Sequence, residues 1–336
     1  EAAATNQFTL TVDQRLVTFD TAVVTGWLET YVRLFSMRQE RRPNPQHIAP
    51  YVAALTRTTD KAPTNALLGT DTDIKEIKAG HNGSALNIMA TVANIQIALG
   101  LGQSNAIAVI EPIYPEISRE ALAVKGITTH LARGESDFVG SPSFRTHNIK
   151  TGVRTFRGIF IQPGEEFSFN GRLGAIDAST GYLPELVIKG KKIIPEYGGG
   201  LCQVSTTFFR AAFLAGLPII ERHPHSIPVR YYSPQGFDAA IYPGSADLRF
   251  TNDIATPLFI QAQTVGTKIF VDVYGAPSAR RITVQGPSVI EKKDDGSLHT
   301  VLIRTVTDDS VNPRRDTFYS FYHSPAEYEV IKNPLE

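Results

Sequence analysis

The sequence predicts an α+β fold in three parts: a small N-terminal α+β domain, a mixed α+β module with a central helix packed on antiparallel strands, and a short β tail. Its 336 residues suffice for two domains and a small third. Helical apolar spacing marks the first third of the chain and one segment near the middle. From about residue 117 the sequence pattern changes to short runs of alternating apolar and polar residues, with many glycines and prolines. We therefore expect domains at 1–115, 116–275 and 276–336.

The N-terminal part reads as strands and helices in alternation. FTLTV at 8–12 alternates as an edge strand does. Asp20 is placed to cap a helix that runs to about Tyr31, and Asn44-Pro45 is a typical start for a second helix. The remaining predictions here are paired strands at 65–69 and 73–78, a helix over 85–99 capped by Ser84 and ended by Gly100 in a left-handed conformation, and a strand at 105–112.

The second part is predicted to surround one helix with short strands. That helix begins at Cys202, runs to about Ala215 and is ended by Gly216 and Pro218. Pro163-Gly164 makes a turn between two apolar runs. Strands are expected at 217–222, 226–232, 246–252, 257–263 and 268–275, with a small β tail beyond residue 276 whose EKKDDG segment is a solvated hairpin tip.

Composition and charge exclude several function classes. Lys+Arg and Asp+Glu both number 33, and a dedicated nucleic-acid binder usually carries a basic excess, so we expect no nucleic-acid partner. No run of 18 apolar residues occurs, so no membrane span is expected in this chain. The first residues, EAAATNQ, have no basic or hydrophobic leader region, and we expect any signal peptide or anchor upstream of Glu1.

Cys202 is the only cysteine and lies at the head of the central helix, directly after three glycines and Leu201. A thiol at a helix N-terminus is favoured as thiolate, which suits a nucleophile. Backbone N–H groups near it would hold an oxyanion or a ligand, and the candidates there are Gly199, Gly200, Gln203 and Ser205. A free cysteine is also a common small buried residue, so this stretch by itself favours a structural cysteine.

A second cluster, ERHPHS, adds support for a reactive rather than a structural cysteine. Its Glu221, His223 and His225 alternate, so extended backbone would place all three on one face. Either histidine could serve as the base for Cys202, with Asp238 or Glu221 orienting the imidazole. The same groups could ligate zinc, but their spacing matches no specific zinc motif, so we expect neither a metal nor another cofactor.

FRTHN supplies two further candidates. Arg145 and Asn148 lie between apolar runs, with His147 beside them. They are interpreted either as anchors of a loop or as groups that bind a carboxylate-bearing ligand.

Several longer stretches resemble the VanW-like family, named for the vancomycin B-type resistance accessory protein. The resemblance covers most of 117–275 and is carried most specifically by GGGLCQVSTT together with ERHPHS. Upstream, 8–115 is similar to the peptidoglycan-binding domain that often precedes this module. The tail resembles the short β extension, sometimes of G5 type, that often follows it. The Ser-His-Gly that precedes the cysteine of L,D-transpeptidases is absent, so a direct match to those enzymes is not expected.

The resemblance implies an extracellular or cell-envelope protein and supplies no known catalytic residues. Together with the thiol cluster it leads to one hypothesis and one alternative. The first is a cysteine-dependent transpeptidase or amidohydrolase-like enzyme that acts on peptidoglycan peptides. The alternative is a non-catalytic module that binds cell-wall polymer or an envelope protein partner, in which Cys202 is structural.

Overall fold

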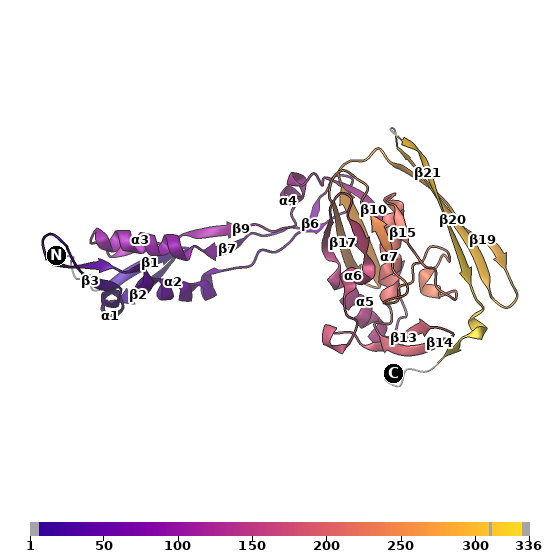
Figure 1. The fold of residues 1–336 in the computed structure, drawn as a ribbon, viewed down its shortest axis with the longest axis horizontal. Coiled ribbons are helices and arrows are strands. Elements are labelled where there is room, and N and C mark those ends of the chain that lie inside the picture. The colour runs from indigo at the N-terminus through magenta and orange to yellow at the C-terminus, as the bar shows by residue number, and fades with distance from the viewer. Residues whose placement is uncertain (1–6, 309–310, 331–336) are drawn as a thin grey trace. The chain divides into compact units, whose positions relative to one another are not determined.

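The computed structural model describes residues 7–308 and 311–330, and the chain folds as mixed α+β, as predicted. It divides into two compact units, Glu1–Leu67 with Glu76–Ser118, and Leu68–Lys75 with Arg119–Glu336. Figure 1 shows both units, each of which is described by itself below. The predicted three-part division at residues 115 and 275 stays a prediction.

The first unit packs helices on a small sheet. β1 (Gln7–Val12) pairs antiparallel with β2 (Arg15–Asp20) and parallel with β8 (Asn105–Ile107). The core, which includes Phe8, Trp27 and Ile95, is fully buried. The other elements are α1 (Thr21–Gly26), β3 (Leu28–Val32), β4 (Gln39–Pro43), α2 (Pro45–Thr59), β5 (Leu67–Leu68), β6 (Glu76–Lys78), β7 (Gly83–Leu86), α3 (Ile88–Gly100) and β9 (Ile110–Ile113).

Four predictions in this unit are wrong in detail. The single strand expected at 105–112 is two strands, β8 and β9, in different sheets. The helix capped by Asp20 ends at Gly26, and the β-branched and aromatic residues that follow form β3 in a hairpin with β4. Asn87, not Ser84, caps α3 by accepting a hydrogen bond from the Ala90 amide, because Ser84 is held in the β7 ladder. The left-handed glycine after α3 is Gly102, at φ 73°.

The second unit is built on a four-stranded sheet in the order β10–β18–β17–β11. The strands are β10 (Thr129–Asp137), β11 (Arg157–Ile161), β17 (Leu258–Val265) and β18 (Lys268–Gly275), and adjacent strands are antiparallel. The central helix α7 (Leu201–Leu214) packs on β10 and β18, while α5 (Ser143–Thr155) packs on β17 and α7. A Cβ at Gly134 would lie 2.1 Å from the Thr207 carbonyl oxygen, so this close approach requires glycine.

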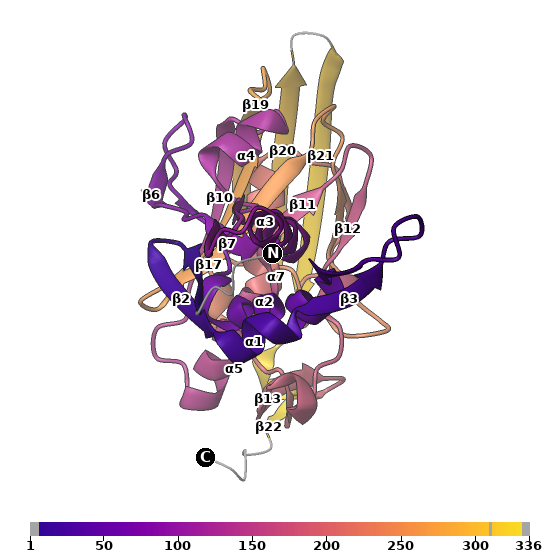
Figure 2. The ribbon, with the colours of Figure 1, turned by 90° about the vertical axis from the view of Figure 1, so that its left-hand side faces the viewer.

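Smaller elements surround this layer. β12 (Glu166–Ser168), β16 (Arg249–Thr251) and β15 (Ile219–Glu221) form one sheet, and β13 (Pro184–Lys189), β14 (Lys192–Tyr197) and β22 (Glu329–Val330) form another. The tail forms a three-stranded sheet whose members lie side by side in Figure 1 and Figure 2. Its strands are β19 (Arg281–Lys292), β20 (Leu298–Asp308) and β21 (Val311–Tyr322), and the remaining short helices are α4 (Arg119–Val124), α6 (Phe169–Leu173), η1 (Ala178–Thr180), η2 (Arg230–Tyr232) and η3 (Pro325–Glu327).

The tail is joined to the C-terminal end of α7 through a buried arginine. Arg304 of β20 donates to the Phe213 and Leu217 carbonyls at 2.7 and 2.8 Å and pairs with Asp316 at 2.5 Å. These donors bond to carbonyl oxygens in the last turn of α7 and in the segment that follows it. The β tail is therefore part of the packing around the central helix.

FRTHN forms the first turns of α5. One strand prediction in this unit is wrong. Residues 226–232 are not a strand: the chain turns there and ends in the 3₁₀ helix η2. Pro224 and Pro228 lack the N–H that a β ladder needs, which accounts for the loss of strand structure.

Candidate active site

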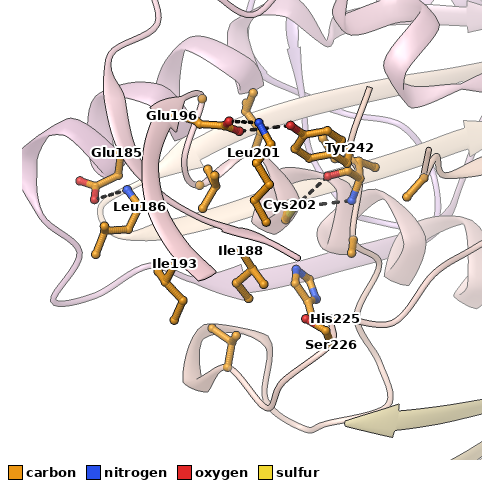
Figure 3. A pocket seen from close by; sticks show the side chains of 18 of the residues that line it. Glu185, Leu186, Ile188, Ile193, Glu196, Leu201, Cys202, His225, Ser226 and Tyr242 are labelled. Atoms are coloured by element: carbon orange, nitrogen blue, oxygen red, sulfur yellow. Dashed lines mark hydrogen bonds and ion pairs between the residues drawn. The ribbon is translucent and has the colours of Figure 1, made fainter. Parts of the chain in front are cut away.

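A cavity of about 1240 Å³ opens in the second unit beside the start of α7. Its walls are the β13–β14 hairpin, the first turn of α7 and the loops at 223–232 and 240–246. Figure 3 shows hairpin residues Leu186, Ile188 and Ile193 along one wall, with Cys202 and His225 opposite. The lining is therefore largely apolar with a few polar groups, which is typical of a ligand-binding site.

Cys202 lies in the first turn of α7 and lines this cavity. Gly200 precedes the helix at φ 109°, a conformation that glycine adopts without strain. The thiol is half-buried, and its sulfur lies 3.4 Å from the Ile241 carbonyl oxygen and 3.5 Å from the Ile241 amide nitrogen. An N–H donor at the sulfur stabilises a thiolate, as does the positive end of the helix.

His225 and Asp238 form a buried pair next to this thiol. His225 Nδ1 lies 2.6 Å from Asp238 Oδ2, and the His225 backbone N–H donates to the same oxygen at 2.9 Å. The second ring nitrogen, Nε2, is buried without a hydrogen-bond partner of standard geometry among the described residues. The thiol of Cys202 nevertheless interacts with this imidazole strongly enough to change the pKa of both groups. Catalytic contacts in the absence of substrate are often loose in this way.

The pKa values of the three groups favour separated charges. Burial opposes the charged form of His225, but Asp238 and Cys202 outweigh it and raise its pKa to about 9. Burial likewise raises the pKa of Cys202, but the interaction with His225 and the Ile241 amide outweighs it, so the net shift is downward. Burial also raises the pKa of Asp238, yet His225, Arg222 and Tyr322 hold it well below its ordinary value. The geometry thus favours a thiolate–imidazolium pair backed by a carboxylate.

Three further residues hold this arrangement in place. The Tyr322 hydroxyl in β21 donates to Asp238 Oδ1 at 2.5 Å, and Arg222 Nη2 donates to the same oxygen at 2.9 Å. Tyr232 stacks on the His225 ring with centroids 4.0 Å apart. Arg222 stands inside ERHPHS, but its partner Asp238 lies 16 residues away, and nothing in the sequence pairs Tyr322 with either.

Glu221 and His223 lie apart from the buried pair. They bond to each other at 2.9 Å, and Glu221 also accepts from the Asp247 amide. The side chain of His223 is 46% exposed, at the rim of the cavity, whereas that of His225 is 5% exposed. The expectation of one shared face is wrong because the strand ends at Glu221 and the chain turns through Pro224.

The groups expected to hold an oxyanion are mostly engaged in other contacts or face away from the cavity. Leu201 and Gln203 donate their backbone N–H groups to the Gly198 and Gly200 carbonyls, so these donors are already engaged. The side chain of Gln203 is buried and donates to Ser136 of β10, and that of Ser205 is also buried. Neither Gln203 nor Ser205 lines the cavity.

Asn148 and Arg145 project from α5 with different partners. Asn148 donates to the Leu183 and Gly199 carbonyls and accepts from the Leu183 amide, so it fixes the glycine turn before Cys202. Arg145 lines the cavity and is described further below. The interpretation of Asn148 as a structural anchor fits these contacts, although the anchored loop is the glycine turn.

The described residues contain neither a cluster of metal-binding side chains nor a membrane-spanning helix. No group of three or more His, Cys, Asp or Glu side chains in 7–308 and 311–330 could hold a metal ion. Within the same ranges, no helix is both long and apolar enough to cross a membrane.

Comparison with known proteins places this site in a recognised domain. The family described as VanW like protein matches residues 144–274, which include Cys202, His225 and Asp238. The uncharacterized protein YoaR of Bacillus subtilis (strain 168) is 31% identical over 247 residues, covering 72% of this chain and 80% of that protein. The vancomycin B-type resistance protein VanW of Enterococcus faecalis (strain ATCC 700802 / V583) is 33% identical over 114 residues, covering 32% of this chain and 41% of that protein.

Solved structures give a weaker similarity. The avibactam carbamoyl enzyme of Ldtfm and a cysteine-to-serine mutant of the Enterococcus faecium L,D-transpeptidase are both 13% identical to this chain. Each covers 33% of it, and 42% and 43% of those chains are matched, at a TM-score of 0.24. That score is too low to argue a shared fold.

Proposed function

Because this chain belongs to the VanW-like family, we propose that it is a cell-envelope protein that acts on peptidoglycan peptides by thiol-dependent acyl transfer or amide hydrolysis. A relative named for vancomycin resistance supports the link to the cell wall. The observation that carries the chemistry is the buried His225–Asp238 pair beside the Cys202 thiol on the wall of a large cavity.

In the proposed reaction, the Cys202 thiolate attacks the carbonyl carbon of a bound amide. A C–S bond forms, and the carbonyl oxygen gains the negative charge at the positive end of α7. The imidazolium of His225 then gives its Nε2 proton to the leaving amine as the C–N bond breaks, which leaves a thioester and neutral imidazole.

The second half-reaction releases the acyl group. His225 Nε2 removes a proton from water or from an acceptor amine, which attacks the thioester and displaces the thiolate. Water gives a carboxylate and hydrolysis, and an amine gives a new amide and transpeptidation. Asp238 keeps the Nδ1 hydrogen bond throughout and so orients the imidazole and stabilises its charged form.

The proposal is tested with purified peptidoglycan fragments and the Cys202→Ala variant. Turnover should be lost in this variant and retained in His223→Ala, a matched control at the cavity rim. Cys202→Ala with wild-type turnover would refute the role of the thiol.

The alternative function also has an observation in its favour, because the Cys202 sulfur contacts both backbone groups of Ile241 and so ties the helix to the loop. In that case the chain binds cell-wall polymer without chemistry. Binding of peptidoglycan that is unchanged in Cys202→Ala, with no turnover by wild type, would favour this alternative.

A further inference from the structure

Arg145 places a buried positive charge on the cavity wall. Its residue is 7% exposed, and its Nη1 donates to Ser141 Oγ at 2.7 Å. Its guanidinium lies 3.9 Å from the centroid of the Tyr231 ring. Among residues 7–308 and 311–330, no carboxylate lies within ion-pair distance of Arg145. Buried charges are normally paired because an uncompensated one is costly.

A second guanidinium adds to the charge at this end of the cavity. Arg230 lies 4.7 Å from the centroid of the same Tyr231 ring and donates to its hydroxyl at 3.0 Å. Burial raises the pKa of Tyr231, but hydrogen bonds with Arg230 and Ser141 and the charges of Arg145 and Arg230 outweigh it and lower the pKa overall. Two guanidinium groups therefore lie against the Tyr231 ring.

This positive end adjoins the thiol. A Cβ at Gly200 would lie 3.0 Å from Arg145 Cγ, so the Arg145 stem packs directly on the turn that precedes Cys202. The charge of Arg145 also contributes to the lowered pKa of Cys202. An anionic group held by Arg145 would thus lie next to a carbonyl placed for attack by the sulfur.

We propose that Arg145 forms a carboxylate subsite, so that the ligand is a peptide with a free carboxylate beside the amide that Cys202 attacks. This inference rests on the proposed function, because it assumes that the cavity takes peptides. A planar guanidinium matches a carboxylate with two parallel hydrogen bonds, and its stacking on Tyr231 fixes that plane. The carboxylate would supply the charge partner that Arg145 lacks within the described part of the chain.

The test uses two alkylating reagents of similar size, iodoacetate and iodoacetamide, that differ in charge. Both report on the same thiolate, so any change in the pKa of Cys202 cancels in the ratio of their rates. The ratio is the rate with iodoacetate divided by the rate with iodoacetamide. In folded wild type it should exceed the ratio for the same cysteine in the urea-unfolded chain. Arg145→Gln should lower the ratio about tenfold or more, since a hydrogen bond to a charged group is being removed.

A control variant distinguishes a carboxylate site at Arg145 from a general attraction of anions by positive charge near the thiol. Arg230→Gln should lower the ratio far less, because Arg230 is exposed and does not line the cavity. An equal ratio in wild type and Arg145→Gln would overturn the proposal. So would a folded wild-type ratio no higher than that of unfolded chain, a result that needs no variant to fold.

The outcome is distinguishable from failure of the proposed function. Alkylation requires no turnover, so a carboxylate subsite can be established or overturned even if peptidoglycan fragments are not cleaved. If they are cleaved, amidation of the carboxylate in the fragment should slow wild type and leave Arg145→Gln unaffected.

Discussion

The most direct prediction concerns Asp238→Asn, which keeps the shape of the side chain and removes its charge. In wild type, interactions with Asp238 and Cys202 raise the pKa of His225 from 6.5 to about 9 against the effect of burial. A rise of that size corresponds to about 3 kcal/mol in favour of imidazolium. Without the Asp238 charge the imidazole should be neutral at pH 7, and the thiolate loses the positive charge that favours it.

The assay is the rate of Cys202 alkylation by iodoacetamide as a function of pH. Between about pH 6.5 and 9 the thiolate–imidazolium pair binds as many protons as thiol and neutral imidazole, so the pH dependence of the unfolding free energy does not detect it. Reactivity does, because only the thiolate is alkylated. We expect wild type to react well below the ordinary cysteine range, and Asp238→Asn to react at least tenfold more slowly at pH 7 with a profile shifted to higher pH.

The same substitution carries a stability cost that must be controlled. The Arg222 side chain is 3% exposed and pairs with Asp238, so Asp238→Asn leaves it without its counter-charge, at a cost of roughly 3–5 kcal/mol. Rates are therefore compared at temperatures where far-UV circular dichroism shows both proteins folded. Identical alkylation profiles in two folded proteins would refute the coupling of Asp238 to the thiol through His225.

Three further predictions follow from neighbouring contacts. Tyr322→Phe removes the hydroxyl that donates to Asp238 and accepts from the Gly236 amide, and urea unfolding should show a loss of about 1–3 kcal/mol, with alkylation also slowed; unchanged stability and rate would contradict this. Because the pKa of Asp238 is lowered in the folded state, this group stabilises the fold above pH 3.8, its ordinary pKa, and the stabilisation is lost as the pH falls below that value. The free energy of unfolding of Asp238→Asn should therefore decrease less steeply below about pH 4 than that of wild type. Arg304→Met removes the buried side-chain donors to the Phe213 and Leu217 carbonyls and should cost about 2–4 kcal/mol in urea unfolding, whereas the exposed Arg281→Met should cost less than about 0.5 kcal/mol.

Local signals predicted much of the fold. The Asn44-Pro45 start and the glycine that ends α7 are encoded within a few residues, and both ends fall where expected. Errors arose where two local signals competed: Ser84 and Asn87 are both acceptable caps, and only the pairing of β7 with β9 decides between them. Such pairing brings together residues distant in sequence, which propensity does not report.

The sequence predicted which residues form the candidate site, but not how they are arranged. Cysteine, histidine and aspartate were selected for their chemistry, yet the choice between His223 and His225 depends on which one the turn at Pro224 buries. Arg222 and Tyr322 were missed because an arginine just after a strand end and a tyrosine in an alternating strand have many ordinary explanations. Their role depends on convergence at one carboxylate oxygen.

That convergence bears on how the protein folds. The groups around Asp238 come from a helix near residue 202, loops near 225 and 238, and a strand that ends at Tyr322. Closing such long loops is slow, because their entropy is lost before the contacts form. A fully reactive Cys202 would therefore emerge only when β21 has docked, so its alkylation rate can serve as a kinetic probe for this late step of folding.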